Sequence, residues 1–249
     1  MSAPVLVTST GGVCELQLNR PEKRNALTLA MYDALVAGML EAEKDDSVRV
    51  ILLSGTGAGF CAGNDLQDFL AGADLGESHS AVRLLRVLPK LRKVLVAAVH
   101  GPTVGFGVTL LLHCDMVLAA RSAQLSMPFL RLGLVPEAAS TLLLPRLIGH
   151  QRASELLLRG LPFDAHTALG LGLVNRVVED GDLPEAARAL AREVAQQPVG
   201  ALLATKRLLR GEPAEIDARI TEELHAFRVQ LGSEEFRRAA QAFLGKRRA

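Results

Sequence analysis

Two glycine-flanked turns contain the residues of this 249-residue chain best suited to do chemistry. One turn runs from Gly59 to Leu66 and the other from His100 to Gly107, and each follows an apolar stretch and precedes a predicted helix. A backbone N–H at the start of a helix has no partner within the helix. Two such groups that converge on one point would stabilise an oxyanion. The alternative is that both segments are simply tight turns.

Glycine-rich turns can also bind nucleotides or carry a nucleophilic serine, but the residues of these turns exclude both kinds of site. Leu110 follows Gly105 and Gly107 at the position where a dinucleotide-binding fingerprint needs its third glycine. The turn over residues 55–63 lacks the Gly-Lys-Ser/Thr ending of a phosphate-binding loop, and no serine lies in a G-x-S-x-G elbow. The six histidines are scattered without metal-ligand spacing, so no metal site is expected.

The elements that must position these turns follow from hydrophobic periodicity. Strands are predicted over residues 13–18, 48–53 and 94–99. One helix is predicted to begin after Thr28, which would be its N-cap, and another is predicted over residues 108–112. This alternation indicates an α/β fold with mostly parallel strands. From Asp182 onward the sequence is helical. We therefore predict a core over residues 1–195 and a C-terminal helical region over residues 196–249.

Composition limits the class of protein. The 28 Lys and Arg residues nearly balance the 27 Asp and Glu residues, so no nucleic-acid partner is expected. The three cysteines, Cys14, Cys61 and Cys114, are odd in number and form no C-x-x-C pair, which indicates a reducing compartment. No signal peptide and no run of about 18 apolar residues is found. We expect a cytoplasmic protein that does not enter a membrane.

Several motifs, taken in order, resemble the landmarks of the enoyl-CoA hydratase/isomerase (crotonase) superfamily. They lie over residues 19–27, 60–66, 100–115, 132–136, 144–149 and 172–178. The resemblance implies a crotonase (ClpP-like) spiral of β-β-α units and a role in fatty acid metabolism. It also implies C-terminal helices that close the pocket and assemble a homotrimer or homohexamer.

The resemblance also implies the binding site. The carbonyl oxygen of a coenzyme A thioester would be held by the backbone N–H groups of Ala62 and Phe106. The residues expected along the coenzyme A moiety are Arg24, Ala26, Ala62, Gly63, Asn64, Asp65, Leu66, Phe243 and Lys246. Coenzyme A belongs to the substrate here, so no separate cofactor is expected. For Lys246, a solvated basic tail is an equal alternative.

The residues at the family's catalytic positions distinguish between its reactions. A hydratase of this family uses two glutamates, but this chain has Thr109 and Phe129 at those positions, and neither can act as a general base. Glu137 instead follows Pro136, where the family commonly has glycine. In this respect the chain resembles the peroxisomal type of Δ3,Δ2-enoyl-CoA isomerase, in which that glutamate is the catalytic base. Another crotonase-type acyl-CoA enzyme, including a hydratase, and a non-catalytic acyl-CoA-binding protein remain alternatives.

The ionisation of Glu137 should reflect two opposing effects. Pro136 is predicted to begin a helix, so the helix dipole would favour the anion by about 0.3–1 kcal/mol. Burial among Phe129, Leu134 and Val135 would favour the neutral acid more strongly. We expect a raised pKa, unless Glu137 is merely an exposed residue at a helix start.

Overall fold

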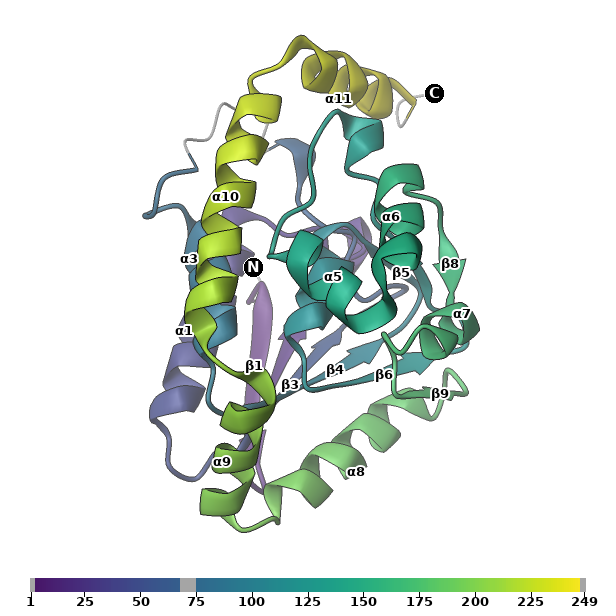
Figure 1. Ribbon diagram of the computed structural model, residues 1–249. Coiled ribbons are helices and arrows are strands. Elements are labelled where there is room, and N and C mark those ends of the chain that lie inside the picture. Colours follow the sequence, from purple (N-terminus) through teal and green to yellow (C-terminus); the bar gives the residue numbers. More distant parts are fainter. Residues whose placement is uncertain (1–2, 68–74, 247–249) are drawn as a thin grey trace.

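The computed structural model describes residues 3–67 and 75–246, and a six-stranded sheet lies at its centre (Figure 1). The strands are β1 (Val5–Thr10), β2 (Val13–Leu18), β3 (Val50–Gly55), β4 (Val94–Val99), β6 (Met116–Ala120) and β9 (Arg176–Val178), in the spatial order β1-β2-β3-β4-β6-β9. Within this sheet, β1 and β2 pair antiparallel, and the other described neighbours pair parallel. The predicted α/β class with mostly parallel strands is therefore confirmed.

A smaller sheet stands beside the large one. It consists of β5 (Pro102–Val104), β7 (Gln124–Ser126) and β8 (Phe163–Asp164), in the order β5-β7-β8. The chain passes from β4 directly into β5 and from β6 directly into β7, so successive pairs of strands contribute to both sheets. This is the repeated strand-strand-helix arrangement that the sequence predicted.

Helices cover both faces of the large sheet. The helices that the structure describes are α1 (Leu29–Lys44), α3 (Ser80–Val87), α4 (Phe106–Thr109), α5 (Ser140–Ile148), α6 (His150–Arg159), α7 (Ala165–Gly170), α8 (Leu183–Ala195), α9 (Val199–Arg210), α10 (Pro213–Leu231) and α11 (Glu234–Lys246). Short 3-10 turns are η1 (Pro21–Lys23), η2 (Leu88–Lys90), η3 (Leu110–His113) and η4 (Leu130–Leu132). None of the helices, within the described residues, is long and apolar enough to cross a membrane.

Alternating side chains of the parallel strands build two apolar layers. Val50 and Leu52 of β3 face α8, where they meet Ala187 and Ala191. Ile51 and Leu53 face the opposite side and join the main core beneath α1, α3 and α10. In Figure 1, α8 lies below the sheet, and α5 and α6 lie above it. Side chains on both faces are therefore buried, as expected for parallel strands.

The element boundaries agree closely with prediction in some places and shift in others. Strands β2 and β4 match, and Thr28 caps α1 by accepting a hydrogen bond from the Met31 N–H. Strand β3 begins and ends two residues later than predicted. The predicted helix over residues 108–112 is α4 followed by the 3-10 turn η3. The division at residues 195 and 196 stays a prediction.

Candidate active site

The two glycine-flanked turns lie against each other. The Val104 N–H donates to the Cys61 carbonyl at 2.9 Å, and the Phe60 N–H donates to the His100 carbonyl at 2.8 Å. Gly63, with φ +81°, stands where the turns are closest, because a Cβ there would lie 2.7 Å from the Val104 oxygen. Only glycine fits this position, so its type is fixed by the contact between the turns.

The turn over residues 20–26 supports the first of these loops from outside. Arg24 and Asn25 both have left-handed backbone, and the Asn25 side chain is buried. Its Nδ2 donates to the Gly59 carbonyl at 2.8 Å and to the Thr56 carbonyl at 2.9 Å. The Arg24 carbonyl accepts a hydrogen bond of 2.9 Å from the Ala62 N–H. The first glycine-flanked turn is thus anchored through its own backbone.

That last bond corrects one prediction. Because the Ala62 N–H is already used by Arg24, it cannot serve as an oxyanion donor, and the assignment of that role to Ala62 was wrong. The backbone N–H groups of Asn64 and Phe106 donate to no other part of the chain that the structure describes. Asn64 follows Gly63, and Phe106 is the first residue of α4. These two residues line both cavities of the site, so their N–H groups are the better pair of donors.

The larger cavity has a volume of about 510 Å³. Six of the residues predicted along coenzyme A line it, namely Ala26, Ala62, Gly63, Asn64, Asp65 and Leu66. Arg24 is not among the lining residues, although its neighbour Lys23 is. Helix α11 contributes Ala239 and Ala242. Phe243 and Lys246 belong to the same helix, but their side chains fall outside the described residues.

Asp65 has a structural role at the rim of this cavity. Its carboxylate accepts a hydrogen bond of 2.7 Å from Arg20 Nη1 and one of 3.0 Å from the Gln67 N–H. Arg20 also donates to the Ala26 carbonyl at 2.9 Å. The pair therefore ties the turn over residues 20–26 to the first glycine-flanked turn.

Glu137 lies in a second, narrower cavity that adjoins the first. Only 6% of the residue is exposed, and its Oε1 accepts a hydrogen bond of 2.9 Å from the Thr109 hydroxyl. Burial raises the pKa of Glu137 to about 8, the Thr109 hydrogen bond opposes that rise, and the charge of Glu223 adds to it. The predicted direction of the shift is confirmed, and the alternative of an exposed glutamate is wrong.

The walls around Glu137 differ from those predicted. Its cavity is lined by aromatic and aliphatic side chains of α1, α3, α4 and α10, among them Tyr32, Leu85, Phe106, Leu224 and Phe227. Phe129 and Leu134, which were expected to surround the carboxyl, line the larger cavity instead. The sequence could not place α10 over the site, because this contact joins segments far apart in the chain.

Glu137 also stands in a different backbone setting from the one predicted. Helix α5 begins at Ser140, and Ala138 and Ala139 before it have left-handed φ values of 64° and 55°. The prediction that Pro136 begins the helix was wrong, because two left-handed residues interrupt the path from Pro136 into it. Glu137 therefore lies outside the first helical turn, and the effect that favours its anion is the Thr109 hydroxyl rather than the helix dipole.

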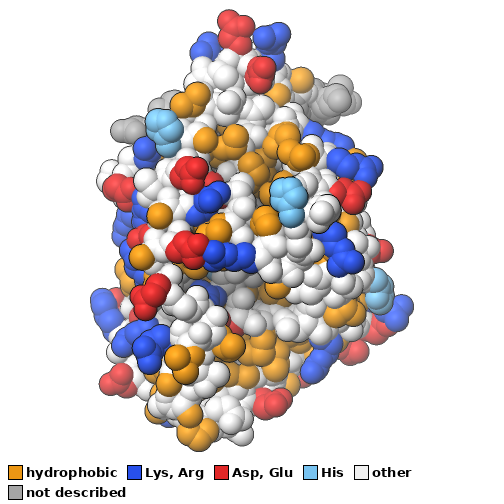
Figure 2. Space-filling model, viewed as in Figure 1, with side chains coloured by type: hydrophobic (Ala, Val, Ile, Leu, Met, Phe, Trp, Pro, Cys, Tyr) orange, Lys and Arg blue, Asp and Glu red, His pale blue; other side chains and the backbone are white. Residues whose placement is uncertain are grey.

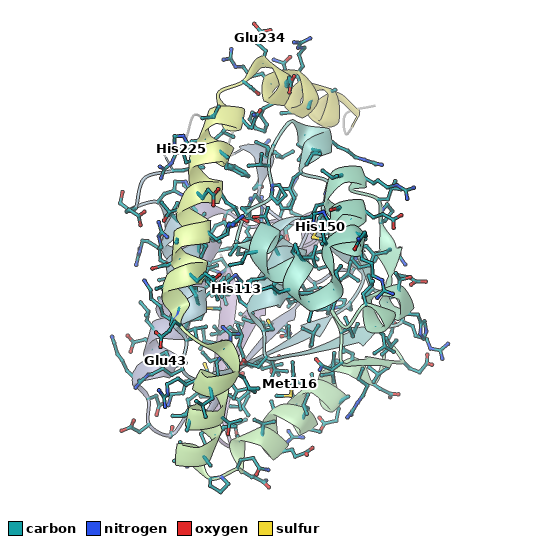
Figure 3. All side chains as sticks on the ribbon, in the orientation of Figure 1. Glu43, His113, Met116, His150, His225 and Glu234 are labelled. Carbon is teal, nitrogen blue, oxygen red and sulfur yellow. The ribbon has the colours of Figure 1, made fainter. Side chains whose placement is uncertain are left out.

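The turn at Ala138 and Ala139 is held by two buried side chains, Glu223 and His113. Sequence analysis did not identify either of them. Glu223 of α10 accepts hydrogen bonds from the N–H groups of Ala139 and Thr141. His113 of η3, labelled in Figure 3 in the interior of the molecule, contacts the Ala138 carbonyl through Nε2 at 2.8 Å. Burial lowers the pKa of His113 to about 4, so the ring is neutral at pH 7 and Nε2 donates.

Within residues 3–67 and 75–246, no cluster of three or more His, Cys, Asp or Glu side chains is placed to hold a metal ion. What the two cavities offer is the carboxyl group of Glu137 and the backbone N–H groups of Asn64 and Phe106, for which the described part of the chain provides no acceptor. Such a set can remove and return a proton next to a carbonyl whose oxygen is stabilised.

Comparisons with known proteins agree with this picture. The model of the family described as Enoyl-CoA hydratase/isomerase matches residues 8–249. The chain is 39% identical to 1,2-epoxyphenylacetyl-CoA isomerase of Escherichia coli, covering 95% of this chain and 93% of that protein. It is 33% identical to enoyl-CoA delta isomerase 2 of Rattus norvegicus, covering 99% of this chain and 64% of that protein. A crystal structure of an enoyl-CoA hydratase/isomerase from Pseudoalteromonas atlantica superposes with a TM-score of 0.94 at 40% identity, covering 98% and 97% of the two chains.

Proposed function

We propose that this chain, which belongs to the enoyl-CoA hydratase/isomerase family, shifts the double bond of an enoyl-CoA from C3 to C2 with Glu137 as its acid–base group. The observation that supports this most directly is the makeup of the narrow cavity. Among its described lining residues Glu137 is the sole carboxyl group. Thr109 and Phe129 occupy the positions where a two-carboxylate hydratase would need glutamates.

The chemistry requires only one carboxylate. Ionised Glu137 removes a proton from C2, and the electrons of the broken C–H bond move into a dienolate that extends from the thioester oxygen to C4. The same carboxyl group then returns the proton to C4, which leaves the double bond between C2 and C3. No water and no second acid is consumed, in agreement with a narrow cavity in which Glu137 is the one carboxyl group among the described lining residues.

The oxyanion of the dienolate would be stabilised by the backbone N–H groups of Asn64 and Phe106. Each preorganised donor of this kind lowers a reaction barrier by about 2.7–4 kcal/mol. Both residues line the two cavities, so a thioester carbonyl at that junction would direct its acyl chain toward Glu137. The coenzyme A moiety would then occupy the larger cavity, along Ala26 and the stretch over residues 62–66.

A second candidate reaction follows from the Escherichia coli relative. That protein is named as an isomerase of 1,2-epoxyphenylacetyl-CoA, and the likeness spans nearly the full length of both chains. An epoxide isomerisation also rearranges an acyl-CoA without adding water. We therefore place it second, ahead of hydration and of acyl-CoA binding without turnover.

Separate incubations with a 3-enoyl-CoA and a 2-enoyl-CoA distinguish these functions. We expect conversion of the 3-enoyl substrate to the 2-enoyl product, and loss of that activity in Glu137→Gln. Rapid hydration of the 2-enoyl substrate, unaffected by Glu137→Gln, would eliminate the proposal. Turnover of 1,2-epoxyphenylacetyl-CoA alone would establish the second candidate, and binding of coenzyme A thioesters with no turnover would indicate a binding protein.

Assembly into a trimer or hexamer and a cytoplasmic location stay predictions. Exposed apolar side chains on α9, which include Val199, Leu208 and Leu209, agree with a subunit contact by the C-terminal helices. Figure 2 shows hydrophobic side chains gathered over this lower part of the molecule.

A further inference from the structure

We propose that Glu223, on α10, is a positioning residue for Glu137, because its carboxylate fixes the turn that carries the base. The proposal rests on the role given to Glu137 above. It assigns to the C-terminal helix α10 a part in the reaction beyond lining the pocket.

The contacts of Glu223 all go to the segment that follows Glu137. Its Oε2 accepts a hydrogen bond of 2.6 Å from the Ala139 N–H. Its Oε1 accepts bonds from the Thr141 N–H at 2.9 Å and from the Thr141 hydroxyl at 2.6 Å. Glu223 therefore caps the start of α5, whose own N-cap residue, Ala139, has no side chain that could do so.

The backbone at this turn needs such an anchor. Ala138 and Ala139 are both left-handed, a conformation that side chains other than glycine adopt at a free-energy cost and keep only where the surroundings enforce it. The Glu223 carboxylate holds the N–H side of the turn, and His113 holds the Ala138 carbonyl. Without the carboxylate, the turn can relax toward ordinary helical backbone, which would rotate Glu137 away from the cavity.

Glu223 also acts on Glu137 through its charge. It is only 5% exposed, and burial raises the pKa of Glu223, whereas the hydrogen bonds from Thr141 and Ala139 and the charge of Arg219 oppose that rise. Three donors point at its two oxygens, an arrangement that favours the anion. A buried negative charge nearby disfavours ionisation of Glu137 and keeps it a stronger base. Other groups around the pair include the Thr109 hydroxyl, the neutral His113 ring and Arg219, whose Nη1 reaches the Thr141 hydroxyl at 3.3 Å. The charge of Glu137 also acts on the buried Cys61 thiol, whose pKa burial raises to about 12, so that this thiol is neutral at pH 7.

The neighbouring residue Glu222 provides a matched control. It lies on the same helix, but its carboxylate is exposed and pairs with Arg219 at 3.3 Å. Glu223→Gln and Glu222→Gln therefore make the same chemical change at a buried and at an exposed position. In Glu223→Gln the amide NH₂ must face a backbone N–H where an oxygen had accepted, so the cap is broken without a change of size.

The test measures kcat and KM for a 3-enoyl-CoA, and titrates the Glu137 carboxyl of the substrate-free protein by ¹³C NMR. For Glu223→Gln we expect kcat to fall about 10- to 100-fold, as a small misplacement of a catalytic group does, with KM nearly unchanged. The titration midpoint of the Glu137 carboxyl should move to lower pH in Glu223→Gln. Glu222→Gln should have the kcat and the titration midpoint of the wild type. Unchanged kcat and midpoint in Glu223→Gln, or equal losses in both variants, would overturn the proposal.

A second variant covers the case in which Glu223→Gln does not fold. Thr141→Val removes one donor to Glu223 but keeps its charge and both backbone bonds, so we expect a smaller loss of kcat with no downward shift of the midpoint. A Thr141→Val protein with wild-type kcat would then overturn the proposal. If the wild type does not isomerise its substrate, the proposed function fails, but the titration still reports whether Glu223 controls Glu137.

Discussion

The Thr109 hydroxyl donates a hydrogen bond of 2.9 Å to Oε1 of Glu137, and both residues are buried. Thr109 stands at the position where a two-carboxylate hydratase would have one of its glutamates. In the proposed function, Thr109 would not provide a second base but would orient the first one, Glu137, from a neighbouring element.

Replacing Thr109 by valine should reduce the fraction of Glu137 that is ionised at pH 7. The hydroxyl bond favours the Glu137 anion, so its removal should raise the pKa of Glu137 further above its ordinary range. Because a hydrogen bond to a charged group contributes about 1.5–3 kcal/mol, we expect kcat/KM at pH 7 to fall at least about tenfold. Thr109→Ser, which keeps the hydroxyl, should stay near the wild type. Equal rates in Thr109→Val and Thr109→Ser would contradict this role of the hydroxyl.

The pH dependence of kcat/KM should report the same carboxyl in the free enzyme. Glu137 acts as a base only when it is ionised, and burial raises its pKa to about 8. Activity should therefore rise with pH through an acid limb near pH 8. An acid limb between pH 4 and 5, typical of an exposed glutamate, would show that the carboxyl is not the buried one described here.

Glu137 should destabilise the folded protein at alkaline pH. A carboxyl whose folded-state pKa is raised contributes stability below its unfolded value of 4.5, and that contribution is lost as pH rises through about 8. Glu137→Gln cannot ionise, so above pH 8 it should be more stable than the wild type by on the order of 2–5 kcal/mol. Denaturant unfolding at pH 9 and at pH 5 measures the difference. The quantity compared is the free energy of unfolding of Glu137→Gln minus that of the wild type. If this difference is no larger at pH 9 than at pH 5, the carboxyl is not buried as described.

Gly63→Ala tests the contact between the two glycine-flanked turns. The new Cβ would lie 2.7 Å from the Val104 oxygen, at a φ of +81° that alanine adopts unfavourably. We expect a loss of about 2 kcal/mol or more in the free energy of unfolding, together with reduced kcat because the Asn64 and Phe106 donors would separate. Circular dichroism melting and steady-state assays measure the two effects.

The matched control is Gly200→Ala in helix α9, where nothing lies within 4 Å of an added Cβ. That change should stabilise the protein by about 0.5–1 kcal/mol, because alanine loses less backbone entropy than glycine in a helix. If the two alanine variants have equal stability and activity, Gly63 is not required by the contact.

The sequence predicted those parts of the fold that local pattern determines. Strand β4 is a continuous apolar run, and Thr28 precedes a helix with a clear apolar face, so both were found correctly. The left-handed turn at Ala138 and Ala139 could not be predicted in this way. Alanine favours right-handed helix, and the turn is held by contacts with residues far from it in the chain, namely Glu223 and His113.

The same reason explains the error in the oxyanion donors. Sequence motifs located the correct turn but could not show that the Arg24 carbonyl accepts from the Ala62 N–H. Which backbone groups stay unpaired depends on how the turn over residues 20–26 packs against its neighbour. Glu137, in contrast, was predicted to be the base from its place after Pro136; its burial and raised pKa are confirmed, and its role as the base stays a prediction.

The most direct measurement is the crystal structure of Glu137→Gln with a bound 3-enoyl-CoA. This variant cannot take the proton, so the substrate should remain intact in the site. We predict that the Gln side chain at position 137 lies within about 3.5 Å of both C2 and C4, as a reactive arrangement requires. The thioester oxygen should face the backbone N–H groups of Asn64 and Phe106. An acyl chain that runs away from position 137, or a thioester oxygen far from both donors, would contradict the double-bond shift proposed for this protein.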